Sequence, residues 1–274
     1  MNFFSNSYNN SRQNESQKSK LLICKYTRSF SKTFKKDIKF IQILFPSLII
    51  KSITTLIFLF LFLMFIILDV YYFDRHNPLF LNEDVMKKFG MSRISVTNNH
   101  QYYRILTATF FHSNVWNLII NAYYLMNIGI IVEKNYGKRH YATMMLLSAL
   151  CGNLLMCATS NCSDMQMGIS TILYGFMGLF LQEIVDRRKE LTDMWNIFGN
   201  YIFALLSLYL TVNMFPFNGN FIGNFGGLFG GFCYPYLLKR DTFHGEGKKL
   251  RIIFSILLIL LLISTIVTLI VAKC

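Results

Sequence analysis

The chain alternates between long uncharged apolar runs and short polar connections that carry most of its charge. A helix needs about 20 residues to cross the hydrocarbon core of a bilayer, and the runs are of this order. The longest of them, within 194–238, exceeds one span, and Pro216 with Asn218-Gly219 predicts a hairpin inside it. The predicted spans fall in 52–68, 105–132, 141–163, 165–182, two parts of 194–238, and 252–272. This pattern predicts an all-α polytopic membrane protein with seven spans.

Basic residues gather in the connections between the predicted spans. The clusters lie in residues 1–51, 134–139, 187–189 and 239–251. With seven spans all four fall on one side of the membrane, and the excess of positive charge in cytoplasmic loops makes that side cytosolic. We therefore expect a cytosolic N-terminus and a luminal or extracellular C-terminus.

Composition agrees with this interpretation. Only 15% of the 274 residues are charged, against roughly 25% in soluble proteins, which leaves little chain for a separate soluble domain. The net charge of +13 would fit a nucleic-acid-binding protein, but the basic stripe of such proteins is missing. We expect membrane lipid around the chain and no nucleic acid as a partner.

The six cysteines show neither metal-ligand spacing nor a compact disulfide framework, and we expect no metal and no cofactor. Cys157 and Cys162 flank a short loop on the predicted luminal side, where a disulfide between them is one interpretation. The other is that both are small buried hydrophobic side chains.

Polar residues inside the spans are the first candidates for function, because polar side chains are costly in hydrocarbon. The second predicted span carries His112, Asn117 and Asn121, and the fourth carries Ser170 and Tyr174. Each has a plain structural interpretation when taken singly: asparagines tie helices together, and a serine bonds the carbonyl of the preceding turn.

The sixth predicted span is rich in glycine. Gly223, Gly227 and Gly231 recur every fourth residue and predict a smooth groove that lets another helix approach closely. Asn224 is a polar residue of the same span.

Taken in order, these motifs resemble the rhomboid family of intramembrane serine proteases. Gly168-Ile169-Ser170, followed by Tyr174 and Gly178, resembles the GxSG nucleophile helix of that family, and the glycine-rich sixth span resembles its AHxGGxxxG helix. The first loop and second span match at Tyr103, Arg104, Thr107, His112, Asn117, Asn121, Gly129, Glu133 and Gly137. The resemblance covers about residues 70–240. It implies a six-helix bundle plus one C-terminal transmembrane helix, a cavity open to the luminal side, and cleavage of transmembrane segments near that face.

The resulting organisation has three parts. We expect a disordered basic cytosolic tail over 1–40, a rhomboid-like six-span membrane domain over 41–240, and a cytosolic linker with a seventh transmembrane helix over 241–274.

Site residues carry over one by one. Ser170 falls on the family nucleophile, Tyr174 on the aromatic residue that packs against the catalytic imidazole, and Asn121 on the oxyanion-stabilising asparagine. Asn117 replaces the second-span histidine associated with the oxyanion site, and Thr171 replaces the second glycine of GxSG.

The most consequential departure is Asn224, which stands where the family has its general-base histidine. A serine hydroxyl needs a neighbour that takes its proton, and an amide cannot hold that proton. Loss of the base typically lowers turnover on the order of 10⁴–10⁶-fold. His112 is the one histidine near the predicted cavity.

Three functions follow. The first is a protein that binds transmembrane segments of client proteins without efficient cleavage. The second is an active intramembrane serine endopeptidase that uses Ser170. The third is a small transporter or channel, which the spans disfavour because they lack central charged residues and an inverted repeat.

Overall fold

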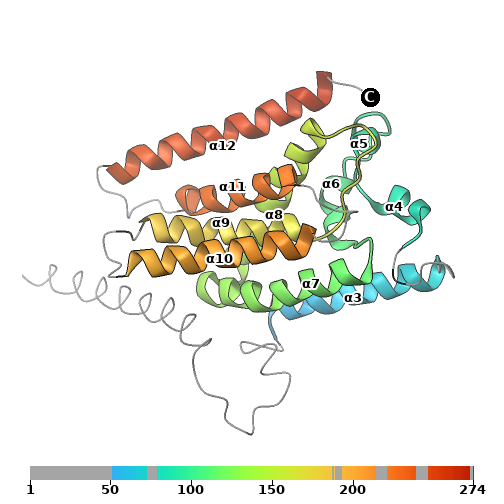
Figure 1. Cartoon of the computed structure of the whole chain (residues 1–274). Helices are drawn as coiled ribbons and strands as arrows, with labels where there is room; N and C mark the ends of the chain where they lie inside the picture. The colour runs from blue at the N-terminus through green and yellow to red at the C-terminus, as the bar shows by residue number, and fades with distance from the viewer. Residues whose placement is uncertain are drawn as a thin grey trace, which may run out of the picture. The chain divides into compact units, whose positions relative to one another are not determined.

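The computed structural model describes residues 51–72, 79, 81–186, 188, 193–213, 221–238, 246–271 and 274, all within one compact unit, Leu44–Cys274. The predicted tail over 1–40 and the hairpin at Pro216 and Asn218-Gly219 lie outside the described residues and stay predictions. The described part is helical, with one isolated antiparallel bridge between Met91 and Gln166 (Figure 1).

Seven long helical elements make up most of the described chain. They are α3 (Ile53–Tyr71), α7 (Val115–Tyr124), α8 (Ile130–Thr159), α9 (Ser170–Asp186), α10 (Met194–Asn213), α11 (Phe221–Leu238) and α12 (Glu246–Val271). A π-helical turn, η2 (Leu125–Gly129), joins α7 to α8. At Gly137 the backbone of α8 leaves helical geometry with φ +80°, so α8 consists of two helical segments. The α7–η2–α8 stretch therefore supplies both the second and the third predicted span.

Short helices fill the connection between α3 and α7. They are α4 (Glu83–Phe89), α5 (Arg93–Thr97), α6 (Arg104–Thr107) and the 3₁₀ turn η1 (Ala108–Phe110). The buried Arg104 guanidinium holds this connection together, because Nη1 donates to the carbonyls of Lys87 and Gly90 at 2.8 and 2.7 Å.

Three helical stretches of the described chain are long and apolar enough to cross a membrane: Ile53–Tyr71, Val115–Thr159 and Lys249–Val271. Between them in the sequence lie α9, α10 and α11, with α12 packed against α8 and α11. The chain is an all-α polytopic membrane protein, as the apolar pattern predicts.

The structure places the span boundaries more closely. The uncharged run that starts at Ile105 holds the second span, which begins at Val115 because residues 104–114 form short turns and the Asn114 side-chain oxygen caps α7 by accepting from the Asn117 backbone N–H at 2.7 Å. The third ends at Thr159, where the backbone becomes extended at Ser160. The fourth begins at Ser170 and not at Met165.

The α9 helix lies at the centre of the bundle and touches α11 backbone to backbone. A methyl group placed on Gly227 would overlap the Thr171 carbonyl, and one on Gly231 would overlap the Gly175 carbonyl. Such close approach fixes the position of one helix relative to the other, since packed cores do not deform continuously.

A buried carboxylate ties α3 to α8. Glu133 accepts from the backbone N–H groups of Ile53 and Thr54 at 2.8 and 2.9 Å and from Thr54 Oγ1 at 2.8 Å. The negative charge lies at a helix N-terminus, where the helix dipole favours it. We refer to Ile53, Thr54 and Glu133 as the Glu133 network.

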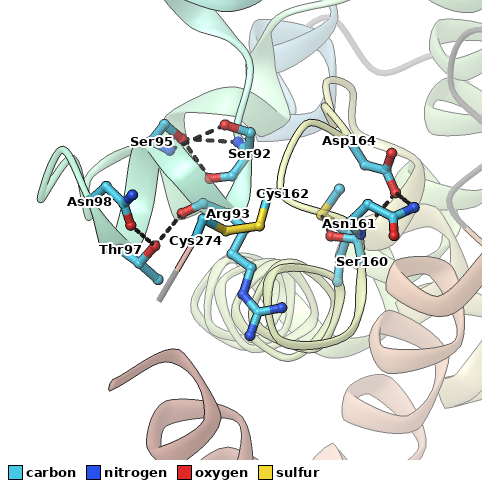
Figure 2. Close-up of a disulfide and its surroundings, with 11 residues drawn as sticks. Ser92, Arg93, Ser95, Thr97, Asn98, Ser160, Asn161, Cys162, Asp164 and Cys274 are labelled. Atoms are coloured by element: carbon cyan, nitrogen blue, oxygen red, sulfur yellow. Dashed lines mark hydrogen bonds between the residues drawn. A yellow bond between two sulfur atoms is a disulfide. The ribbon is translucent and has the colours of Figure 1, made fainter. Parts of the chain in front are cut away.

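Cysteine pairing differs from the sequence-based interpretation. Cys162 forms a disulfide with Cys274, and Cys157 is free and buried together with Cys151 and Cys233 (Figure 2). Of the two interpretations of Cys157 and Cys162, the disulfide between them was therefore wrong, and burial as a small hydrophobic side chain is confirmed for Cys157. Cys157 faces the core from the end of α8, while α12 brings Cys274 to the turn that carries Cys162.

Candidate active site

Ser170 is the first residue of α9, and the segment before it is held in place by backbone hydrogen bonds. Met91 and Gln166 exchange two such bonds, of 3.0 and 2.8 Å, and the Gly168 N–H donates to the Ala108 carbonyl at 3.1 Å. Gly168 has φ +115°, a conformation that favours glycine. The turn into α9 therefore has one defined geometry, which leaves the Ser170 side chain nearly buried.

An imidazole and a carboxamide lie beside this turn. From the position that a Cβ atom would take on Gly168, His112 Cδ2 is 3.6 Å away and Asn121 Nδ2 is 3.7 Å away. The Asn121 amide nitrogen donates to the Asn117 side-chain oxygen, which orients it. An amide nitrogen carries two hydrogens, so the second can serve a ligand at the turn.

Asn224 lies on α11 directly after Gly223, close to where this helix meets the start of α9. It is buried, its neighbour Gly223 packs near Gln166, and Gly227, one turn later, contacts Thr171. Within the described residues neither side-chain polar atom of Asn224 has a hydrogen-bond partner. No hydrogen bond therefore joins Asn224 to Ser170 here, and the amide has both a donor and an acceptor to offer.

Two further residues of α9 belong to the predicted site. Tyr174 lies one turn after Ser170, and its buried hydroxyl has no partner among the described residues. Thr171 has room for its branched side chain because the facing residue of α8 is Gly152. A Cβ atom on Gly152 would lie 2.9 Å from Thr171 Cγ2, which explains how this departure from GxSG is accommodated.

His112 is the histidine next to the serine-bearing turn. Burial lowers the pKa of its imidazole to about 3, since no charged partner offsets the cost of desolvation. The ring is neutral over the physiological range, and both ring nitrogens lack partners in the described chain. Such a weak base accepts a proton from serine poorly, because an effective general base has a pKa near the working pH.

The other histidines lie elsewhere or outside the described residues. His100 Nδ1 pairs with the Tyr102 hydroxyl at 3.0 Å, and His140 Nδ1 pairs with the Tyr234 hydroxyl at 3.1 Å. His76 and His244 are outside the described ranges. Among the residues that the structure describes, no group of three or more His, Cys, Asp or Glu side chains could hold a metal ion.

Sequence reasoning missed Gln166. This side chain is buried, its Oε1 has no partner within the described part of the chain, and it packs against Gly223. The signal was present in the sequence: a glutamine inside an apolar run, two residues before Gly168. We refer to Ser170, His112, Asn121, Gln166 and Asn224 as the Ser170 site.

Fold and site define the class: a polytopic membrane protein whose polar site lies at the start of a buried helix inside the bundle. The family model for the Rhomboid domain matches residues 99–241, slightly more than half of the chain. The chain belongs to the rhomboid family.

Curated relatives show moderate similarity. Rhomboid-like protease 1 of Toxoplasma gondii is 26% identical over 179 residues, which cover 64% of this chain and 60% of the relative. RHOMBOID-like protein 1 of Arabidopsis thaliana is 28% identical over 54% of this chain and 38% of the relative. Inactive RHOMBOID-like protein 8 of the same plant is 30% identical over 48% of this chain and 37% of the relative. The matched region thus spans from about a third to three fifths of each of these relatives.

Proposed function

We propose that this chain binds transmembrane segments of other membrane proteins at the Ser170 site and does not cleave them efficiently. The observation that carries the proposal is Asn224, a buried carboxamide on α11 near the start of α9 whose side-chain polar atoms have no partner among the described residues. It offers hydrogen bonds to a bound peptide but cannot hold a proton. A relative with the word inactive in its name is compatible with a family member that binds without turnover.

The second candidate function is a slow intramembrane serine endopeptidase. One observation favours it: the neutral, unpaired imidazole of His112 beside Gly168 has a free lone pair. The relative named as a protease is compatible with this alternative. The low pKa of His112 weighs against it, because the proton of Ser170 would have to move to a weak base.

A reconstitution experiment separates the two functions. The full chain is placed in liposomes with a synthetic transmembrane peptide that carries a photo-crosslinker, and crosslinking and cleavage are both measured. We expect a crosslink without cleavage for the native chain, and cleavage in the Asn224→His variant that adding Ser170→Ala abolishes. Cleavage by the native chain that Ser170→Ala removes would establish the endopeptidase. Absence of any crosslink would refute binding.

A fluorophosphonate probe provides an independent check. Labelling at Ser170 requires an activated hydroxyl. We expect no labelling of the native chain and labelling of Asn224→His.

We also propose that the disulfide end of the bundle faces the luminal or extracellular side and the opposite, basic end faces the cytosol. Lys138 Nζ donates to the Lys51 carbonyl at 3.5 Å, so two of the basic clusters lie at the same end. Disulfides persist in oxidising compartments, and the excess of Lys and Arg marks the cytosolic side. Protease protection of tags at the two termini tests this orientation.

A further inference from the structure

The disulfide joins two parts of the chain that are 112 residues apart, with the Cα atoms of Cys162 and Cys274 separated by 5.8 Å. Cys162 lies eight residues before Ser170, in the turn between α8 and α9. Cys274 follows α12, and Figure 2 shows the bond beside α5 and this turn. The covalent link therefore connects the outermost helix to the segment that leads into the Ser170 site.

The Cys162 side of the link is held firmly. The Asp164 carboxylate accepts from the Asn161 backbone N–H at 3.0 Å and from its side-chain amide at 3.1 Å (Figure 2). Four residues after Cys162, the paired hydrogen bonds between Gln166 and Met91 follow. Cys162 is therefore joined to the turn at Gly168 by a short segment that is hydrogen-bonded along its length.

The Cys274 side is held less firmly. Only 11% of the most apolar stretch of α12 is buried within the chain, so most of its surface is left to the membrane. Near its end Leu269 packs against a cluster that contains Met91, Met156 and Cys157. Lipid is as apolar as these side chains, so burial alone gives little preference for the docked position of α12 in a bilayer.

We propose that the Cys162–Cys274 disulfide is a redox-dependent clasp that fixes the end of α12 and thereby the 160–169 segment before Ser170. The clasp forms when the two thiols give up two protons and two electrons to the disulfide of an oxidoreductase by thiol–disulfide exchange, and a dithiol reverses the reaction. Its existence does not depend on what the Ser170 site binds.

The first test is thiol counting in the full chain. Free thiols are blocked with N-ethylmaleimide in denaturant, the chain is reduced, and newly released thiols are labelled with a maleimide polymer that shifts the band. We expect two labels in the native chain, none in Cys162→Ser or Cys274→Ser, and two in the matched control Cys157→Ser. No label in the native chain, or loss of label in Cys157→Ser, would overturn the proposal.

The second test asks whether the clasp stiffens the site. Hydrogen exchange of the backbone amides of Met91 and Gln166 is compared in the same membrane mimetic for the native chain, Cys274→Ser and Cys233→Ser, since Cys233 is free, buried and in a different cluster from Met91. We expect at least tenfold faster exchange in Cys274→Ser and native rates in Cys233→Ser. Equal rates in all three would show that the bond does not restrain the site. Neither test measures client binding. If either test contradicts the clasp, the proposed function is therefore unaffected.

Discussion

The Glu133 network and the Ser170 site differ in whether their buried polar groups are paired by hydrogen bonds. Glu133 accepts three hydrogen bonds from α3, two from backbone N–H groups and one from the Thr54 hydroxyl. In the Ser170 site, atoms of His112, Asn121, Gln166 and Asn224 are buried without partners among the described residues. An unpaired buried polar group costs about 1–3 kcal/mol, which a ligand that supplies the missing bonds recovers. The first arrangement serves stability, and the second is suited to binding.

The largest expected effect is in the Glu133 network. Glu133→Ala leaves two backbone N–H groups of α3 and the Thr54 hydroxyl without their acceptor, and we expect a loss of about 3 kcal/mol or more. Thermal unfolding in detergent measures it. The matched control is Glu83→Ala, an exposed carboxylate that lies 3.6 Å from Lys87 and should have no measurable effect. Equal stability of the two variants would contradict the comparison.

A substitution at Asn224 tests whether the unpaired polar groups of the Ser170 site serve binding and not stability. Asn224→Leu keeps the branching and the number of side-chain heavy atoms and removes two unpaired buried polar atoms, so we expect unchanged stability or a gain of up to about 2 kcal/mol. Crosslinking to a transmembrane peptide should fall at the same time. A loss of stability as large as that of Glu133→Ala would mean that the amide is structural.

Acidification should reveal the contribution of His112 to the pH dependence of stability. Its native pKa of about 3 lies below the ordinary 6.5, so between these values the unfolded chain binds more protons than the native one. Stability is therefore full above pH 6.5 and falls by up to about 1.4 kcal/mol for each pH unit below it. Melting temperatures at pH 7.5 and 5.5 measure this loss. His112→Gln should flatten the profile, and an unchanged slope would exclude His112 as its source.

The smallest expected effect concerns a paired hydroxyl between α7 and α10. The Tyr124 hydroxyl lies 2.9 Å from Ser207 Oγ, and such bonds between membrane helices contribute about 0.6 kcal/mol on average. Tyr124→Phe, Ser207→Ala and the double variant form a cycle whose coupling energy should match this value. A coupling energy near zero would show that the hydrogen bond between Tyr124 and Ser207 does not contribute to stability.

Much of the fold could be predicted because the long apolar runs of the sequence coincide with its long helices. The run 52–68 became α3 and the run 252–272 became most of α12. The start of the second span could not be read from the run, because residues 105–114 are as uncharged as the helix that follows and the cap at Asn114 decides the boundary. The family assignment was confirmed, while the roles of Ser170, Asn224, Asn121, Asn117 and Tyr174 stay predictions.

The disulfide and Gln166 show where sequence reasoning stopped. Cysteine connectivity depends on which helix ends meet in space, and the sequence offered only the nearby pair Cys157 and Cys162 as an alternative to two buried thiols. Gln166 looked like one polar residue of a span, because its place in the bridge with Met91 appears only when the connection before α7 folds over it. Both features depend on contacts between distant segments.

The Met91–Gln166 bridge has a consequence for selectivity. It fixes the segment before Ser170, while the glycine contacts with α11 fix α9 itself. Promiscuous binding surfaces adapt by repacking flexible side chains, and neither of these supports allows that. A binding site held stiffly on two flanks discriminates by shape, so we expect this protein to accept a narrow repertoire of membrane segments.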